Sequence, residues 1–175
     1  GVTSALDYLH KKKLVHRDIR LSNIVVENSK KRAVLCDFQL CSDEKDLGEL
    51  LPGVVGGHSY GAPEVYLESR VSEKSDIYSL GVAMYRALTS EYPRDFQGYS
   101  RKEIQTHYAG ASKWEYWSSM RQALRSVPKS VRSIVKACMQ YEPDNRPTAC
   151  EVNEKLEKSY KKLSGSQFFG YNGFI

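Results

Sequence analysis

Residues 16–23 read H-R-D-I-R-L-S-N, and residues 36–39 read C-D-F-Q. A His-Arg-Asp triplet, an asparagine five residues after its aspartate, and a second aspartate before a phenylalanine form an unusual combination. It provides one carboxylate, Asp18, and two further hard oxygen donors, Asn23 and Asp37. These groups match what phosphoryl transfer from a metal-bound nucleotide requires, namely a base and ligands for the ion.

The segment between these two motifs predicts a β-hairpin. Residues 24–26 and 33–36 are short apolar runs, and residues 27–32 between them have the polar composition of a turn. Asn23 would stand where the chain enters one strand and Asp37 where it leaves the other. The hairpin would therefore bring these two side chains together, which gives them a geometric reason to share one ion.

Helices are predicted on both sides of this hairpin. Residues 2–9 place apolar side chains at helical spacing, with no capping residue before them, so we expect a helix cut from a longer protein. Residues 38–62 lack a period and are rich in glycine, which predicts a long functional loop. Helices would resume at Ser75, where a segment that is apolar on nearly all sides predicts a buried central helix.

Two later stripes predict the remaining helices. The members of the first stripe are Val131, Ile134, Val135 and Cys138, and those of the second are Ala149, Val152, Leu156, Tyr160 and Leu163. Thr148 and Glu151 form a capping-box pattern at the start of the last helix. The non-periodic aromatic and glycine-containing tail, residues 164–175, is expected to be either disordered or docked by its aromatic side chains.

Composition restricts the classes of function. A chain of 175 residues with a net charge of +5 is long enough for one core. Its short basic runs have no interleaved aromatic residues, so we expect solvated surface and no nucleic-acid partner. The four cysteines show no C-x-x-C pair, which favours reduced thiols and a cytoplasmic location. No segment has the length and hydrophobicity of a membrane span.

The chain resembles the C-terminal, catalytic lobe of a eukaryotic-type protein kinase over residues 1–163. Besides the first two motifs, with D-F-Q in place of D-F-G, the resemblance rests on A-P-E at residues 62–64, D-I-Y-S-L-G at residues 76–81 and R-P-T at residues 146–148. It implies an α+β protein kinase-like fold, here its mainly α-helical C-lobe with a small β-hairpin that carries the catalytic and metal-binding loops.

The resemblance also implies roles for individual residues. Asp18 would be the catalytic base, and Arg20 would contact the γ-phosphate of ATP in place of the lysine of serine/threonine kinases. Asn23 and Asp37 would bind Mg²⁺ and, with Val25, the nucleotide. The implied structural and regulatory residues are His16 and Phe38 in an internal spine, Glu64 and Arg146 in a buried ion pair, Asp76 beneath the catalytic loop, and Arg17 facing the activation loop.

Three further features bear on what the resemblance implies. Arg17 faces a loop whose first half offers one hydroxyl, Ser42, among several acidic residues, so an acidic partner is expected, with local backbone as the rival. Gln39 replaces a glycine, which either locks the loop with Asp37 turned inward or impairs metal binding. The stretch G-G-H-S-Y at residues 56–60 resembles the serine/threonine form G-T-x-x-Y, which favours serine/threonine over tyrosine specificity.

The resemblance covers only one lobe of the expected two. Since no glycine-rich loop, strand lysine or helix-C glutamate is present, the N-lobe is expected outside these residues, and the chain alone is predicted to be inactive. The expected function of the parent is ATP- and Mg²⁺-dependent phosphorylation of protein substrates. The alternative is a pseudokinase or interaction module whose open cleft is covered by a partner.

Overall fold

The computed structural model describes residues 1–27, 29, 32–43, 58–110, 117, 118, 120 and 122–164. Its elements in chain order are α1 (Val2–Lys11), β1 (Leu14–Val15), η1 (Leu21–Asn23), β2 (Ile24–Glu27), β3 (Arg32–Leu35), β4 (Ser42–Asp43), η4 (His58–Tyr60), α2 (Pro63–Leu67), α3 (Glu73–Thr89), α4 (Arg101–Gly110), α6 (Lys129–Cys138), η5 (Pro143–Asn145) and α7 (Ala149–Ser164). Within the described part of the chain, no helix is both long and apolar enough to cross a membrane.

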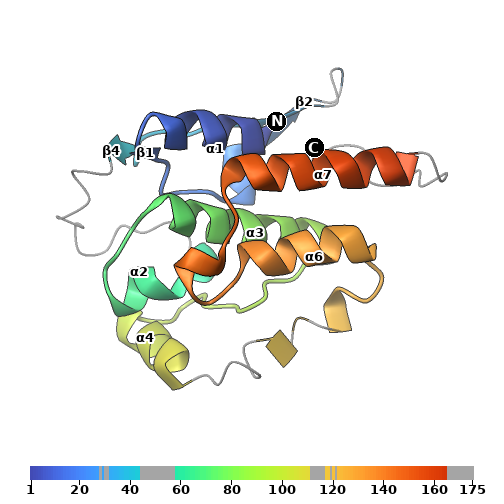
Figure 1. Cartoon of the computed structure of the whole chain (residues 1–175). Helices are drawn as coiled ribbons and strands as arrows, with labels where there is room; N and C mark the ends of the chain where they lie inside the picture. Colours follow the sequence, from blue (N-terminus) through green and yellow to red (C-terminus); the bar gives the residue numbers. More distant parts are fainter. Residues whose placement is uncertain are drawn as a thin grey trace.

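The helices form layers around α3 (Figure 1). Helices α1 and α7 lie side by side on one side of α3, α6 packs along it, and α2 and α4 pack together on the opposite side. Ten residues of α3 between Ser75 and Tyr85 are buried, because most of its circumference faces another element. This confirms the prediction of a central helix with almost no polar face.

The predicted hairpin is present. Strands β2 and β3 pair antiparallel, with Ile24 opposite Leu35 and Glu27 opposite Arg32. The backbone N–H of Cys36 donates to the carbonyl of Asn23 at 2.8 Å, so the pairing extends to the residue before Asp37. The hairpin thus brings the chain segments of Asn23 and Asp37 together, as the sequence indicated.

Three elements were not expected within residues 38–62 and just after them, and one of them is the short 3-10 helix η4 at His58–Tyr60. Ser42 and Asp43 form β4, which pairs with β1 near the start of the 16–23 loop. Helix α2 begins at Pro63, where a proline in the first helical turn needs no N–H partner and already has the required φ. The prediction that helices resume at Ser75 was therefore wrong: α3 itself begins at Glu73, capped by Ser72.

In the last helix the predicted capping box is confirmed, whereas the predicted apolar stripe is wrong at Tyr160. Glu151 Oε2 accepts from the backbone N–H of Thr148 at 2.8 Å, and Glu151 N–H donates to Thr148 Oγ1 at 3.2 Å. Tyr160 is 47% exposed, whereas Ser159 is buried. Helix α7 extends to Ser164, and the remainder of the predicted tail lies outside the described residues.

Candidate catalytic and metal-binding site

The carboxylate of Asp76 organises the beginning of the 16–23 loop. This side chain, 2% exposed, lies in the first turn of α3. Its Oδ2 accepts the backbone N–H of His16 at 2.8 Å, and its Oδ1 accepts that of Arg17 at 2.9 Å. These two hydrogen bonds place Asp76 beneath the loop, as the resemblance implied. A buried carboxylate is tolerated there because several donors satisfy it.

His10 is a further contact to Asp76 that the sequence reasoning missed. Its Nε2 lies 3.0 Å from Asp76 Oδ2, and its side chain is 8% exposed. The signal was present in the sequence, because residue 10 falls on the same helical face as the buried Leu6. A titratable side chain on the buried face of an amphipathic helix requires a partner, and α3 provides it.

His16 is fully buried and its hydrogen bonds fix one tautomer. Its Nδ1 accepts the backbone N–H of Asp18 at 3.3 Å, so its Nε2 carries the proton and donates to the carbonyl of Cys36 at 3.2 Å. Its ring also meets Phe38 edge to face, with centroids 5.0 Å apart. The imidazole thus connects the 16–23 loop to the segment that carries Asp37, consistent with the spine that the resemblance implied.

Asp18 and Asn23 form a hydrogen-bonded pair across the loop. The amide Nδ2 of Asn23 donates to Asp18 Oδ2 at 2.8 Å and to the Asp18 carbonyl at 3.0 Å. The other carboxylate oxygen, Asp18 Oδ1, is buried and has no hydrogen-bond partner among the described residues. A buried acceptor without a donor is costly.

The residues present fit a magnesium ion. Asn23 Oδ1 has one contact, at 3.3 Å from Ser22 Oγ, and the exposed carboxylate of Asp37 accepts one long hydrogen bond, at 3.4 Å from the N–H of Gln39. Both keep oxygen lone pairs for an ion, and oxygen donors are what Mg²⁺ selects. Asn23 and Asp37 could therefore hold it, with water and nucleotide phosphates as its other ligands.

Backbone strain is concentrated at two of these positions. Arg17 and Asp37 have φ values of 71° and 62°, the left-handed region that costs a side-chain-bearing residue energy. Gln39 is not among the described residues with positive φ. The conformational freedom of glycine is thus not required at position 39 in this state of the loop, and the exposed Gln39 side chain fits.

Arg17 and Arg20 point to different parts of the site. Arg17 Nη1 donates to the hydroxyl of Ser42 at 3.2 Å. Of the acidic residues expected to face Arg17, Asp43 is described in β4, and those of residues 44–49 lie outside the described residues, so the expected acidic partner of Arg17 stays a prediction. The guanidinium of Arg20 lies 6.0 Å from the ring centroid of Tyr60. Val25, on β2, is 54% exposed and available to a ligand.

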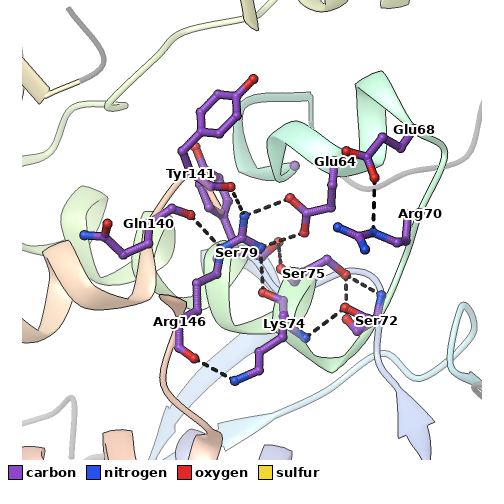
Figure 2. A network of polar contacts seen from close by, with 12 residues as sticks. Glu64, Glu68, Arg70, Ser72, Lys74, Ser75, Ser79, Gln140, Tyr141 and Arg146 are labelled. Atoms are coloured by element: carbon purple, nitrogen blue, oxygen red, sulfur yellow. Dashed lines mark hydrogen bonds and ion pairs between the residues drawn. The ribbon is translucent and has the colours of Figure 1, made fainter. Parts of the chain in front are cut away.

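The expected Glu64–Arg146 ion pair is confirmed (Figure 2). Arg146 donates from Nη1 to Glu64 Oε1 at 2.6 Å and from Nη2 to Oε2 at 2.8 Å, and both side chains are at most 3% exposed. The remaining donors of the guanidinium reach the carbonyls of Gln140, Tyr141 and Lys74. Complete satisfaction of its donors makes this charge acceptable in the core.

Comparisons with known proteins identify the family to which the chain is similar. The family model described as "Protein kinase domain" matches residues 1–156. The chain is 29% identical, over 90% of its length, to an EPD1-interacting receptor-like cytoplasmic serine/threonine-protein kinase of Nicotiana benthamiana. It is 31% identical, over 86% of its length, to a calcium and calcium/calmodulin-dependent serine/threonine-protein kinase of Lilium longiflorum. It is 30% identical, over 87% of its length, to PTI1-like tyrosine-protein kinase 3 of Arabidopsis thaliana. The chain spans 36%, 28% and 40% of these relatives, respectively.

Proposed function

The chain belongs to the protein kinase family, and on that premise we propose that residues 1–163 are the catalytic lobe of a kinase that transfers the γ-phosphoryl group of ATP to protein hydroxyls. The observation that carries this proposal is Asp18. One oxygen of its carboxylate is held by Asn23, and the other is buried without a donor. A substrate hydroxyl would supply that donor and at the same time be oriented for attack.

Each residue of the site has a distinct task in this reaction. Asp18 accepts the hydroxyl proton through Oδ1, because its carboxylate is fixed by Asn23 and cannot turn away. Asn23 and Asp37 would hold Mg²⁺, whose charge would stabilise the negative charge that develops on the phosphate oxygens. Arg20 contributes a further positive charge two residues beyond the base. Asp76 acts through the backbone, by keeping His16 and Arg17 in place.

Serine and threonine are the proposed acceptors. Two of the relatives above are named serine/threonine-protein kinases, although a third is named a tyrosine-protein kinase. The G-G-H-S-Y stretch at residues 56–60 adds support through its similarity to G-T-x-x-Y. Phosphoamino-acid analysis of a phosphorylated substrate mixture tests this, with phosphotyrosine as the result that contradicts it.

Radiolabelled ATP tests the catalytic role directly. In a full-length parent that carries an N-lobe, we expect Asp18→Asn to reduce transfer by about 100-fold or more, the usual contribution of a general base. Asp7→Asn, on the outer side of α1, is the matched control and should leave transfer unchanged. The 175-residue chain alone is expected to show no appreciable transfer. A parent in which Asp18→Asn stays fully active would contradict the role of Asp18 as base, and an unaltered parent without any transfer would favour the interaction-module alternative.

A further inference from the structure

Tyr60 lies between two arginines beside the 16–23 loop. This side chain, 4% exposed, receives a hydrogen bond from Arg86 Nη1 at 3.4 Å, and the Arg20 guanidinium lies 6.0 Å from its ring centroid. Arg86 is itself held on the ring of Tyr92, 3.8 Å from the centroid, and Tyr92 meets Tyr60 edge to face at 5.5 Å. The Arg86 guanidinium is therefore fixed in position by two aromatic side chains.

The hydroxyl group of Tyr60 accepts hydrogen bonds, but its own proton is not donated to any described residue. It accepts the N–H of Leu21 at 3.5 Å and the Nη1–H of Arg86 at 3.4 Å, which occupies its acceptor positions. Its own O–H has no acceptor among the residues that the structure describes. This proton and the Arg86 guanidinium are therefore two neighbouring donors at one place.

The arginines also lack a counter-charge in the described part of the chain. The ion pairs found there join other residues and include neither Arg20 nor Arg86. Both side chains are half-buried, so water alone satisfies them less completely than it would at an open surface. The Arg86 guanidinium and the neighbouring phenolic O–H, which have no acidic partner among the described residues, form a pair of donors that suits an anion.

We propose that Arg86 and the Tyr60 hydroxyl bind an acidic side chain of the protein substrate, two or three residues from the hydroxyl that is phosphorylated. The inference rests on the proposed function and adds a substrate class to it. Tyr60 touches Leu21, three residues after Asp18, so the site adjoins the base. An extended peptide advances about 3.3 Å per residue, which allows one side chain to reach the site while another reaches Asp18.

Peptide binding tests this without any catalytic step, so its outcome is independent of whether the lobe transfers phosphate. The probes are a fluorescein-labelled peptide with a central serine and three glutamates on either side, and copies with glutamine or lysine replacing every glutamate. Fluorescence anisotropy with the 175-residue chain gives the dissociation constants. We expect the glutamate peptide to bind about five-fold more tightly than the glutamine peptide, the effect of one partly exposed ion pair.

Variants separate a direct contact from general charge or altered packing. Arg86→Gln should remove the preference for glutamate, whereas Arg125→Gln, which removes an exposed arginine elsewhere, should keep it. Arg86→Glu should reverse it in favour of the lysine peptide, a change that a purely structural role for Arg86 cannot produce. Equal affinity of the unaltered chain for the glutamate and glutamine peptides overturns the proposal, as does the same loss in Arg125→Gln.

Discussion

The imidazole Nε2 of His10 lies 3.0 Å from Oδ2 of Asp76, a contact that joins α1 to α3 beneath the 16–23 loop. The same oxygen accepts the backbone N–H of His16, so His10 helps to hold the carboxylate that holds the loop. His10 thus acts on the candidate site through another residue. Its contribution can be measured as stability, because the contact is nearly inaccessible to water.

Replacing His10 with phenylalanine should destabilise the fold. The variant keeps a ring of similar size but removes one of three donors from a buried carboxylate, which we expect to lower the free energy of unfolding by about 1–3 kcal/mol. Urea denaturation measures this. Lys11→Gln is the control on the same helix, since it removes only the partly exposed Lys11–Asp7 pair, which solvent screens, and should leave the stability nearly unchanged. If both variants lost the same free energy of unfolding, the contact of His10 with Asp76 would not contribute more than an exposed ion pair.

Loss of Arg146 should be more severe. Arg146→Met leaves the buried Glu64 carboxylate and three backbone carbonyls without their donors, so we expect a loss of about 3–5 kcal/mol. Glu64→Gln, which keeps an acceptor for the guanidinium, should lose less and provides a variant that still folds. Arg70→Met is the control, because the Arg70–Glu68 pair is more than half exposed on both sides. A Glu64→Gln chain as stable as the control would contradict the structural role of the pair.

Gly81 provides a test in which packing and helix propensity predict opposite signs. An alanine in the middle of a helix normally stabilises it by about 0.5–1 kcal/mol relative to glycine. At Gly81 of α3, however, a Cβ would lie 2.6 Å from Met139 Cγ and 2.8 Å from Cys138 Cβ, so α6 would have to move away. We expect Gly81→Ala to cost about 1–3 kcal/mol.

Gly110 is the matched control for that substitution. It ends α4, and a Cβ there would meet no atom within 4 Å. Thermal or urea unfolding of Gly110→Ala should show unchanged or slightly increased stability, up to about 1 kcal/mol. If Gly81→Ala were also stabilising, this result would contradict the close packing of α6 against Gly81 of α3.

The capping box at Thr148 predicts a pH dependence. Hydrogen bonds to Glu151, first from the backbone N–H of Thr148 and then from its hydroxyl, lower the pKa of this carboxyl below its ordinary value of 4.5. A carboxyl whose pKa is lower in the folded chain stabilises the fold above pH 4.5, and this contribution is lost as the pH falls through the lowered value.

Melting temperatures of Glu151→Gln between pH 7 and pH 3 measure this contribution. We expect the variant to be less stable at neutral pH by roughly 0.5 kcal/mol, the usual effect of an exposed carboxylate in a first helical turn, and the difference to vanish at low pH. Glu154→Gln, an exposed position one turn further along α7, is the control. A difference that persists unchanged at pH 3 would exclude ionisation of Glu151 as its cause.

Local patterns explain which elements the sequence could predict. The hairpin, the apolar stripe of residues 131–138 and the Thr148 cap depend on neighbouring residues, and each appears at its expected place. Strand β4 consists of two residues and forms because it pairs with β1. It is too short to show a sequence periodicity from which it could be predicted. After Leu156, the helical period permits residue 159 or 160 on the buried side, and only packing selects Ser159 over Tyr160.

In the candidate site, too, some features could be predicted from local sequence and others depend on tertiary contacts. The 16–23 loop and Asp37 belong to motifs whose spacing is visible in the sequence, and the Glu64–Arg146 pair was implied by the resemblance to protein kinases. The contacts of His10 with Asp76 and of Arg86 with Tyr60 join helices or loops that are distant in the chain. Nothing near Arg86 in the sequence indicates Tyr60 as its hydrogen-bond partner, so these contacts required the tertiary structure.

Anchoring of the 16–23 loop to Asp76 has a consequence for how the chain exchanges protons with solvent. The amides of His16 and Arg17 belong to a loop, yet they donate to a carboxylate buried in the first turn of α3. To exchange, they must first break hydrogen bonds to a buried carboxylate, so their protection factors should exceed those of ordinary loop amides. In deuterium oxide these two amides would therefore exchange more slowly than their place in a loop suggests.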